Sequence, residues 1–255
     1  MLQYERYAFI LNRLKETGTV TVSVLSKDLQ VSESTIRRDI TDLDHAGRLK
    51  KVFGGAVRRD EERIAKFMNM ADKSAVNVDE KREIAAYAAG LIRDNEYVYL
   101  DAGTTTGALI EFLDNKTVTY VTNASRHALE LAAKGLQVFL IGGMVRTDTE
   151  SIVGSVAVEN IRRFHFDRCF MGVDAIDVHL GLTTSNTEEG MIKTEAVRHG
   201  QHVYILADHS KFDQISHVTF AGLEAGCIIT DREPDPNYKK LTEVIVTKGK
   251  EGNAS

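Results

Sequence analysis

Apolar residues recur at helical spacing in three short segments of the first fifty residues. The segments run over residues 5–17, 20–29 and 33–46, and each places its apolar side chains on one side of a helix. Gly18 ends the first segment, and Ser32 is a good N-cap for the third. The pattern predicts three short helices that pack around a small common core.

The third predicted helix has an unusual outward face. At about 100° per residue, Ile36, Ile40 and Leu43 share its apolar side. The polar side and its flanks carry short hydroxyls and two arginines, namely Ser32, Ser34, Thr35, Arg37, Arg38 and Thr41. A solvated amphipathic helix, the alternative, would usually carry Glu and Lys there. Short hydroxyls let a helix approach DNA closely and arginine bonds bidentately to guanine, so the pattern favours a recognition helix in the major groove.

A short basic strand pair is expected directly after this helix. Residues 48–53 alternate enough for a strand, and Gly54 and Gly55 permit a tight turn. Residues 1–60 hold eleven Lys and Arg against eight Asp and Glu, a net charge of +3, whereas the rest of the chain has a net charge of −8. A solvated basic loop would show the same composition. Beside a recognition helix, however, Lys50 and Lys51 are typical of a wing that contacts phosphates.

Apolar strands and amphipathic helices alternate through the remaining two hundred residues. The strands are predicted at residues 97–100, 117–121, 137–141, 168–173, 202–207, 227–230 and 243–246. Helices are predicted between several of them, including residues 108–113 and 126–133. This alternation indicates a mostly parallel sheet that is covered on both faces. In such sheets, ligands bind beyond the carboxyl ends of the strands.

The loops at those strand ends are small and polar. The candidate ligand residues in them are Asp101, Gly103, Thr104, Thr105, Thr106, Thr122, Asn123, Gly142, Gly143, Asp208 and Lys211. Taken singly, Thr and Gly at a helix start are more often caps, and Asp208 with Lys211 is more often a surface ion pair. Four such loops at equivalent strand ends converge on one cleft, and Gly, Thr and helix amides suit a phosphate.

The sequence resembles the DeoR-type bacterial transcription regulators over nearly its whole length. The run from Val31 to Ile40, VSESTIRRDI, followed by Gly47-Arg48-Leu49 and Phe53-Gly54-Gly55-Ala56, is similar to their N-terminal signature. Phe53 is a departure, because many members have histidine there. The resemblance continues in Asp101-Ala-Gly-Thr-Thr, Thr122-Asn123, Ile141-Gly142-Gly143, Phe170-Met171-Gly172, Gly181-Leu182-Thr183 and Asp208-His209-Ser210-Lys211-Phe212.

This resemblance implies a sensor domain similar to ribose-5-phosphate isomerase and the coenzyme A transferases. In the family, the domain senses a phosphorylated sugar or a related metabolite and does not turn it over. Lys193 falls where members often have a lysine that faces the ligand. Among the subfamilies, the nearest resemblance is to the fructose-operon repressors, whose effector is fructose 1-phosphate, although no residue selects that sugar.

Composition excludes several other classes of protein. The longest uncharged stretch, Gly135 to Val145, is far shorter than the roughly 18 apolar residues of a membrane span. No signal peptide is visible, and two cysteines suit a reducing cytoplasm, where we expect the protein. The histidines form no metal-binding motif and no nucleotide-binding glycine motif occurs, so neither a metal nor a cofactor is expected.

We therefore predict an α/β protein in three parts. Residues 3–58 form a winged helix-turn-helix DNA-binding domain, residues 59–78 a linker, and residues 79–250 a mostly parallel α/β domain that senses a sugar phosphate. The expected function is a repressor of a sugar-metabolism operon that binds double-stranded operator DNA as a dimer or tetramer. The alternative is a sugar-phosphate isomerase with an accessory helical domain, in which Asp208 or a glutamate is the base and Lys211 its electrostatic partner.

Overall fold

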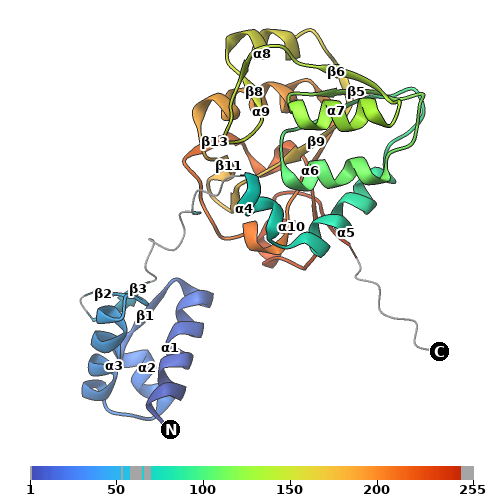
Figure 1. Ribbon diagram of the computed structural model, residues 1–255. Coiled ribbons are helices and arrows are strands. Elements are labelled where there is room, and N and C mark those ends of the chain that lie inside the picture. Colours follow the sequence, from blue (N-terminus) through green and yellow to red (C-terminus); the bar gives the residue numbers. More distant parts are fainter. Residues whose placement is uncertain (1, 53, 58–64, 66–69, 248–255) are drawn as a thin grey trace, which may run out of the picture. The chain divides into compact units, whose positions relative to one another are not determined.

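The chain forms two compact units, Met1–Glu62 and Arg63–Ser255 (Figure 1). The computed structural model describes residues 2–52, 54–57, 65 and 70–247. Half of the predicted linker and the last residues of the predicted sensor domain lie outside this description. Within the described residues, no helix is both long and apolar enough to cross a lipid bilayer.

The first unit is a winged helix-turn-helix. Its elements are α1 (Gln3–Thr17), β1 (Thr19–Thr21), α2 (Val22–Leu29), α3 (Glu33–His45), β2 (Lys50–Val52) and β3 (Gly55–Val57). The three strands form one antiparallel sheet in the order β1-β3-β2. The predicted hairpin is therefore present. It is joined by a third strand, β1, which was not predicted from the sequence.

The second helix was expected to begin at residue 20. It begins at Val22 instead, because the residues before it form strand β1. Thr21 caps α2, because its hydroxyl accepts a hydrogen bond from the amide of Val24 at 3.3 Å. The preceding residues are thereby free to pair with β3. Gly55 is required at this contact, because a Cβ atom there would lie 2.0 Å from the carbonyl oxygen of Val20.

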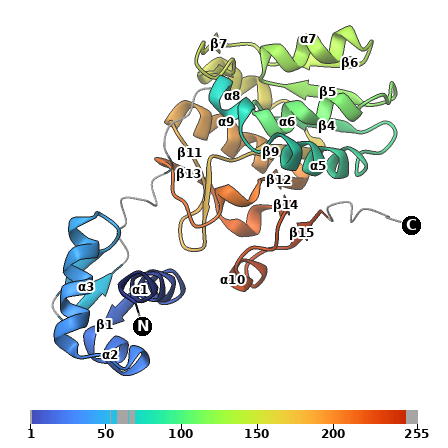
Figure 2. The ribbon, with the colours of Figure 1, turned by 60° about the horizontal axis from the view of Figure 1, so that its bottom comes forward.

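The second unit is built on a seven-stranded parallel sheet, and each of its strands was predicted. The strands are β4 (Tyr97–Leu100), β5 (Thr119–Thr122), β6 (Gln137–Leu140), β9 (Phe166–Gly172), β12 (Gly200–Leu206), β14 (Cys227–Thr230) and β15 (Val244–Val246). They are ordered β15-β14-β12-β9-β4-β5-β6, with every neighbouring pair parallel. Figure 2 shows β6 and β15 at opposite edges.

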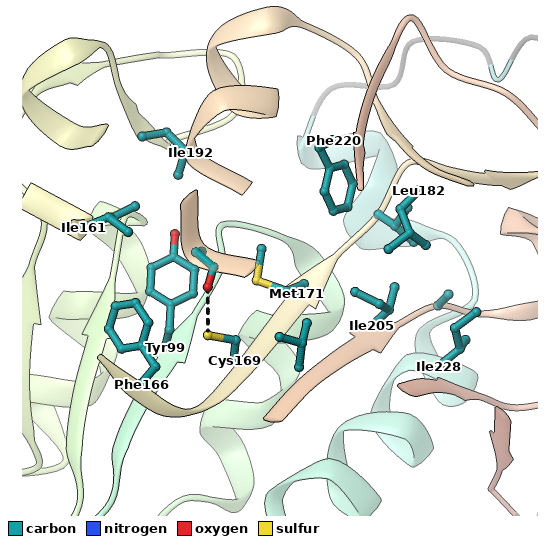
Figure 3. Packing of buried hydrophobic residues seen from close by; sticks show 14 of the residues in the cluster. Tyr99, Ile161, Phe166, Cys169, Met171, Leu182, Ile192, Ile205, Phe220 and Ile228 are labelled. Atoms are coloured by element: carbon teal, nitrogen blue, oxygen red, sulfur yellow. Dashed lines mark hydrogen bonds between the residues drawn. The ribbon is translucent and has the colours of Figure 1, made fainter. Parts of the chain in front are cut away.

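Helices cover both faces of this sheet because alternate strand residues point to opposite sides. On one face, α5 (Val78–Ala89), α6 (Thr104–Leu109) and α7 (Ser125–Ala133) pack on a core that includes Val98 and Phe170. On the other, α8 (Ser155–Ile161) and α9 (Thr187–Arg198) pack on Tyr99 and Cys169. Figure 3 shows this second core, in which the Cys169 thiol donates to the carbonyl of Ala196 at 3.3 Å.

The remaining elements include two small sheets and a short helix near the C-terminal end that were not predicted. Two small antiparallel sheets are formed by β10 (Ala175–Asp177) with β11 (Gly181–Thr184) and β13 (Val218–Ala221), and by β7 (Met144–Val145) with β8 (Ile152–Val153). Helix α4 (Met70–Ala75) lies within the predicted linker, and α10 (Pro236–Lys239) precedes β15. The helix expected over residues 108–113 instead begins at Thr104 and ends in the 3-10 turn η2 (Ile110–Phe112).

Candidate functional site

Helix α3 presents the polar surface that its sequence predicts. Ile36, Ile40 and Leu43 are buried in the core of the first unit, so Ser34 and Arg38 on the opposite side are exposed. Ser32 caps the helix by accepting a hydrogen bond from the amide of Thr35 at 3.2 Å. The rigid core therefore presents the first two turns of α3 to solvent.

The cationic side chains on this surface differ in their hydrogen-bond and ion-pair partners. The guanidinium of Arg37 donates to Glu33 at 3.0 Å, one turn earlier on α3. The ammonium of Lys51 on the wing donates to the hydroxyl of Thr41 at 2.8 Å, whereas Lys50 is exposed. Arg38 has no hydrogen-bond or ion-pair partner among the residues that the structure describes. Its side chain is available to a base edge without breaking a protein contact.

A buried ion pair fixes α3 against α1. The guanidinium of Arg6 forms two hydrogen bonds, of 2.6 and 2.9 Å, with the carboxylate of Asp39, which is only 1% exposed. Next to it, the Tyr7 hydroxyl donates to Asp42 at 2.9 Å. The hydrogen bond to Asp39 raises the pKa of Arg6 further above its ordinary value. The sequence reading missed this clamp, because Arg6 and Asp39 are 33 positions apart and share no motif.

The second unit contains a polar cleft at the carboxyl ends of β4 and β9. Small polar groups and four lysine ammonium groups line the cleft. The described lining residues are Met70, Lys73, Lys81, Ala102, Gly103, Thr104, Thr105, Thr149, Gly172, Val173, Asp174, Thr184, Glu189, Lys193 and Lys211. Five of the residues predicted from the sequence meet here: Gly103, Thr104, Thr105, Lys193 and Lys211.

A buried ion pair forms the floor of the cleft. The ammonium of Lys193 on α9 contacts the carboxylate of Asp101 and donates to the carbonyl of Gly172 at 2.9 Å. The amide of Gly172 in turn donates to Asp101 at 3.0 Å. Burial alone would lower the pKa of Lys193, but the adjacent Asp101 carboxylate outweighs it and raises that pKa. Lys193 therefore stays charged, and Asp101 positions it from behind the cleft wall.

A second ion pair crosses the cleft from α4. The ammonium of Lys73 bonds to the carboxylate of Asp174 at 2.6 Å, and the amide of Ser185 donates to the same carboxylate at 2.9 Å. Burial opposes ionisation of Asp174, but Lys73 outweighs it and the pKa of Asp174 lies below its ordinary value. The sequence reading missed Lys73 and Asp174, since Lys73 lies in a charged segment without a clean period.

Two further lysines line the cleft, and they differ in their hydrogen bonding. Lys81 on α5 is buried, and its ammonium donates to the carbonyls of Lys73 and Val76, the latter at 2.7 Å. Burial lowers the pKa of Lys81. The ammonium of Lys211 has no hydrogen bond or ion pair with the residues that the structure describes. Lys211 is thus the cation with most freedom to bind a ligand anion.

The three consecutive threonines at the start of α6 have different surroundings. Thr104 and Thr105 line the cleft, and their hydroxyls have no partner within the described part of the chain. The hydroxyl of Thr106 instead donates to the carbonyls of Asp101 and Gly103, at 2.7 and 2.9 Å. Thr106 was predicted as a ligand residue, but its side chain is fully buried and holds the loop in shape.

Four other predicted ligand residues are not among the described residues that line the cleft. The hydroxyl of Thr122 donates to the carbonyl of Leu100 at 2.6 Å, which joins β5 to β4. Asn123 accepts from the Tyr99 hydroxyl at 2.9 Å and from the amide of Ala102 at 3.1 Å. Gly142 and Gly143 lead into β7. Thr122 and Asn123 thus join the adjacent ends of β4 and β5 through internal hydrogen bonds.

Asp208 also supports the cleft from outside its described lining. Its carboxylate accepts hydrogen bonds from the Asn77 side chain at 2.8 Å and from the hydroxyl and amide of Ser210. Burial alone would raise the pKa of Asp208, but the Ser210 hydroxyl and Lys211 keep it below its ordinary value. Asp208 is therefore an ionised carboxylate that holds the Lys211 turn.

Three potential metal ligands come together that no sequence motif indicated. Glu80, His209 and Asp231 place one ligand atom each within 4.8 Å of the others. The ring of His209 bonds to Asp231 at 2.7 Å, and the guanidinium of Arg232 lies 3.4 Å from Asp231 and 3.6 Å from Glu80. Arg232 thus supplies the positive charge that a metal ion would otherwise bring.

Comparisons with known proteins cover both units. Residues 6–62 match the DeoR-like helix-turn-helix domain, and residues 76–232 match the DeoR C terminal sensor domain. The chain is 37% identical to the uncharacterized HTH-type transcriptional regulator FruR of Bacillus subtilis, over 97% of this chain and 100% of that protein. It is 33% identical to the HTH-type transcriptional repressor GlcR of the same organism, over 99% of each.

A third relative is the putative aga operon transcriptional repressor of Escherichia coli O157:H7, which is 34% identical over 83% of this chain and 80% of that protein. Among solved structures, ribose 5-phosphate isomerase A from Methanocaldococcus jannaschii aligns with a TM-score of 0.39 and 18% identity. That alignment covers 53% of this chain and 55% of the isomerase, about half of each. Because both units match and the curated relatives align over most of the sequence, the chain belongs to the DeoR family of helix-turn-helix proteins with a C-terminal sensor domain.

Proposed function

We propose that this protein represses a sugar-metabolism operon and that a phosphorylated sugar relieves the repression. One observation carries the proposal: four lysines and two unpartnered threonines line a cleft in a chain that also presents a recognition helix. The three curated relatives described above are all named as transcriptional regulators or repressors. We place the protein's action in the cytoplasm, where operator DNA is found.

The charges around the cleft favour a ligand with a phosphate group. The four lining lysines outnumber the two lining carboxylates, Asp174 and Glu189. The free ammonium of Lys211 and the hydroxyls of Thr104 and Thr105 supply donors that suit phosphate oxygens. A sugar also brings hydroxyl donors, and the buried carboxylate of Glu189 is an acceptor for them. The donor and acceptor set thus matches a sugar phosphate better than a neutral sugar.

The Lys73–Asp174 ion pair provides a route from the cleft to the DNA-binding unit. An incoming phosphate competes with Asp174 for the ammonium of Lys73, and Lys73 lies on α4. Helix α4 is the first described helix after the segment that joins the two units. Differential binding of the phosphate to two positions of α4 would shift the population of DNA-binding arrangements.

On the DNA side, Arg38 and Ser34 are the proposed base-reading residues. Lys50 and Lys51 on the wing are proposed to bind phosphates, with Arg37 at the flank of α3. One recognition helix contacts too few bases for typical specific affinity, so we propose that two or more chains bind paired half-sites. Fructose 1-phosphate is the first effector to test, because the FruR relative shares the highest identity of the three.

The isomerase alternative has no support among those relatives, none of which is named as an enzyme. Asp208, one of its two proposed bases, is also poorly placed. Asp208 is occupied by hydrogen bonds from Asn77 and Ser210 and is not among the described residues of the cleft lining. An assay of turnover with pentose and hexose phosphates separates the two functions, since the regulator binds such compounds without converting them.

A thermal-unfolding screen tests the sensor half of the proposal. The full chain is heated with fructose 1-phosphate, fructose 6-phosphate, ribose 5-phosphate, inorganic phosphate and unphosphorylated fructose. A ligand at 100 times its dissociation constant adds about 2.7 kcal/mol of stability, which raises the midpoint by several degrees. We expect one sugar phosphate to do so while free fructose does not. A shift with none of the phosphorylated compounds contradicts the proposed ligand class.

A further inference from the structure

Strand β6 ends the seven-stranded sheet with one side unpaired. In the described part of the chain, its only strand neighbour is β5, with Gln137 opposite Thr119 and Leu140 opposite Thr122. Figure 2 shows β6 as the outermost strand on its side of the sheet. Its outer backbone amides and carbonyls are therefore a template for a further strand.

The surface around this edge is apolar. Phe139 and Leu140 are 46% and 47% exposed, and Met144 and Val145 on β7 are 56% and 54% exposed. Val156 on α8 is 58% exposed, and Asn160, one helical turn after it, lies close to Gly142. Exposed apolar side chains therefore lie on β6, on β7 and on α8, and exposed apolar surface of this kind usually marks an interaction site.

The β6 edge also lacks the charges that normally keep edge strands apart. Residues 135–145 contain no charged side chain and are the longest uncharged stretch of the sequence. The opposite edge strand, β15, is preceded by Lys239, Lys240 and Glu243 and followed in sequence by further lysines. Natural proteins protect exposed edges with such charges. Charged residues thus flank the β15 edge, whereas the β6 edge lacks this protection.

We propose that the β6 edge binds the β6 edge of a second copy of this chain, in antiparallel orientation about a twofold axis. A twofold axis places the same patch on both sides, so an uncharged edge meets no opposing charge. The strands alone bury less than the roughly 800 Å² per partner of a stable interface, so β7 and the start of α8 take part. This inference deepens the proposed function, since paired recognition helices need a twofold-related partner.

The mass of the full chain in solution, by light scattering or sedimentation, tests the interface. The wild type is expected to have at least twice the mass of one chain. In Leu140→Lys, each copy brings a charged side chain into the uncharged contact, so the dissociation constant should rise at least ten-fold. Leu241→Lys is the matched control, because Leu241 is 48% exposed and precedes the other edge strand. It should leave the mass unchanged.

Disulfide trapping locates the contact independently of the lysine variants. Single cysteines are placed at positions 137 to 140 in a Cys227→Ser background, where the remaining Cys169 is fully buried. Opposite residues in an antiparallel pair lie within disulfide range, so the position nearest the axis should give a covalent dimer upon oxidation. Leu241→Cys should not.

A monomeric wild type overturns the proposal. So does a dimer that survives Leu140→Lys unchanged and gives no disulfide at any β6 position, because the copies then meet elsewhere. Neither readout involves DNA or sugar phosphate. A chain that binds fructose 1-phosphate but remains a monomer would therefore contradict the interface while leaving the sensor function standing.

Discussion

At the scale of single residues, the two adjacent arginines of α3 differ in whether another side chain binds them. Arg37 is held by Glu33 on its own helix, whereas Arg38 has no partner among the described residues. An arginine that gives up no protein contact gains the full value of a bidentate bond to a base. The sequence places both arginines on the helix surface but cannot show which of them is already paired.

We expect Arg38→Ala to weaken specific DNA binding by about 1–3 kcal/mol and to relax sequence preference, because a base-edge contact is lost. Affinity for a set of duplexes that differ by one base pair measures both effects. Arg37→Ala is the matched control, with a smaller loss and an unchanged preference. Equal losses for every duplex in Arg38→Ala would show that Arg38 contacts only phosphate.

Lys51 represents the other kind of contact. Its ammonium reaches Thr41 from the wing, and we propose that it binds DNA phosphates, which carry no sequence information. Lys51→Ala should weaken binding to specific and unrelated duplexes alike and lower the slope of log affinity against log salt by about one unit. A selective loss for one sequence in this variant would assign Lys51 to base recognition instead.

His127 gives the second unit a defined response to acid. It is 4% exposed, and burial lowers its pKa to about 4 from an ordinary value of 6.5. Between these two values, the unfolded chain binds a proton that the folded chain does not, so stability falls as pH falls. At about 1.4 kcal/mol per pH unit, the loss from pH 7 to pH 4.5 is about 2–3 kcal/mol.

His127→Gln should remove this part of the acid sensitivity. Urea unfolding of the second unit, followed at pH 7 and at pH 4.5, measures it as the difference between wild type and variant. The variant can be less stable at pH 7 through lost packing, but its stability should change less with pH. Identical changes with pH in both proteins would show that His127 takes up its proton equally in the folded and unfolded states.

At the scale of elements, the start of α6 shows how one loop combines two roles. Thr105 faces the cleft with a free hydroxyl, and the hydroxyl of Thr106 bonds to the backbone of its own loop. Hydrogen bonds to charged groups are worth about 1.5–3 kcal/mol. We therefore expect that loss of the Thr105 hydroxyl weakens the proposed phosphate contact, whereas loss of the Thr106 hydroxyl weakens the loop.

Paired valine variants separate these roles. Thr105→Val should reduce the affinity for the sugar phosphate by roughly ten-fold to over a hundred-fold with little change in the unfolding midpoint. Thr106→Val should lower the midpoint by several degrees, because it leaves buried carbonyls without their donor. Calorimetric titration and thermal unfolding of both variants measure the two effects. A reversed pattern would place Thr106 at the ligand.

The elements also show how far the sequence predicts this fold. All seven strands of the main sheet were predicted, because each is a short apolar run between turn residues. Strand β1 was missed, since its pairing with β3 depends on Gly55 in the wing, 34 positions after Thr21 in the sequence. Lys73 and Asp174 were missed because their contact joins residues 101 positions apart. Local patterns predict elements, whereas such contacts depend on tertiary packing.

At the scale of the whole molecule, the two units have separate cores. The DNA-binding unit packs on residues between Ile10 and Ala56, and the sensor unit has its own two apolar clusters. Substitutions in the cleft should therefore leave the recognition helix intact. In our proposal, the effect of a ligand reaches the DNA through the connecting segment or through the arrangement of paired chains. Either route would change DNA affinity without changing the DNA-reading residues.

The most direct test is the DNA affinity of the full chain with and without effector. A duplex selected from a random pool is labelled, and its fluorescence anisotropy is followed while the sugar phosphate found in the thermal screen is added. The account predicts release from the wild type, no release by the unphosphorylated sugar, and unchanged DNA affinity of Thr105→Val with at least ten-fold more effector needed for release. DNA affinity that ignores every sugar phosphate, or a Thr105→Val protein that responds at the wild-type concentration, would contradict it.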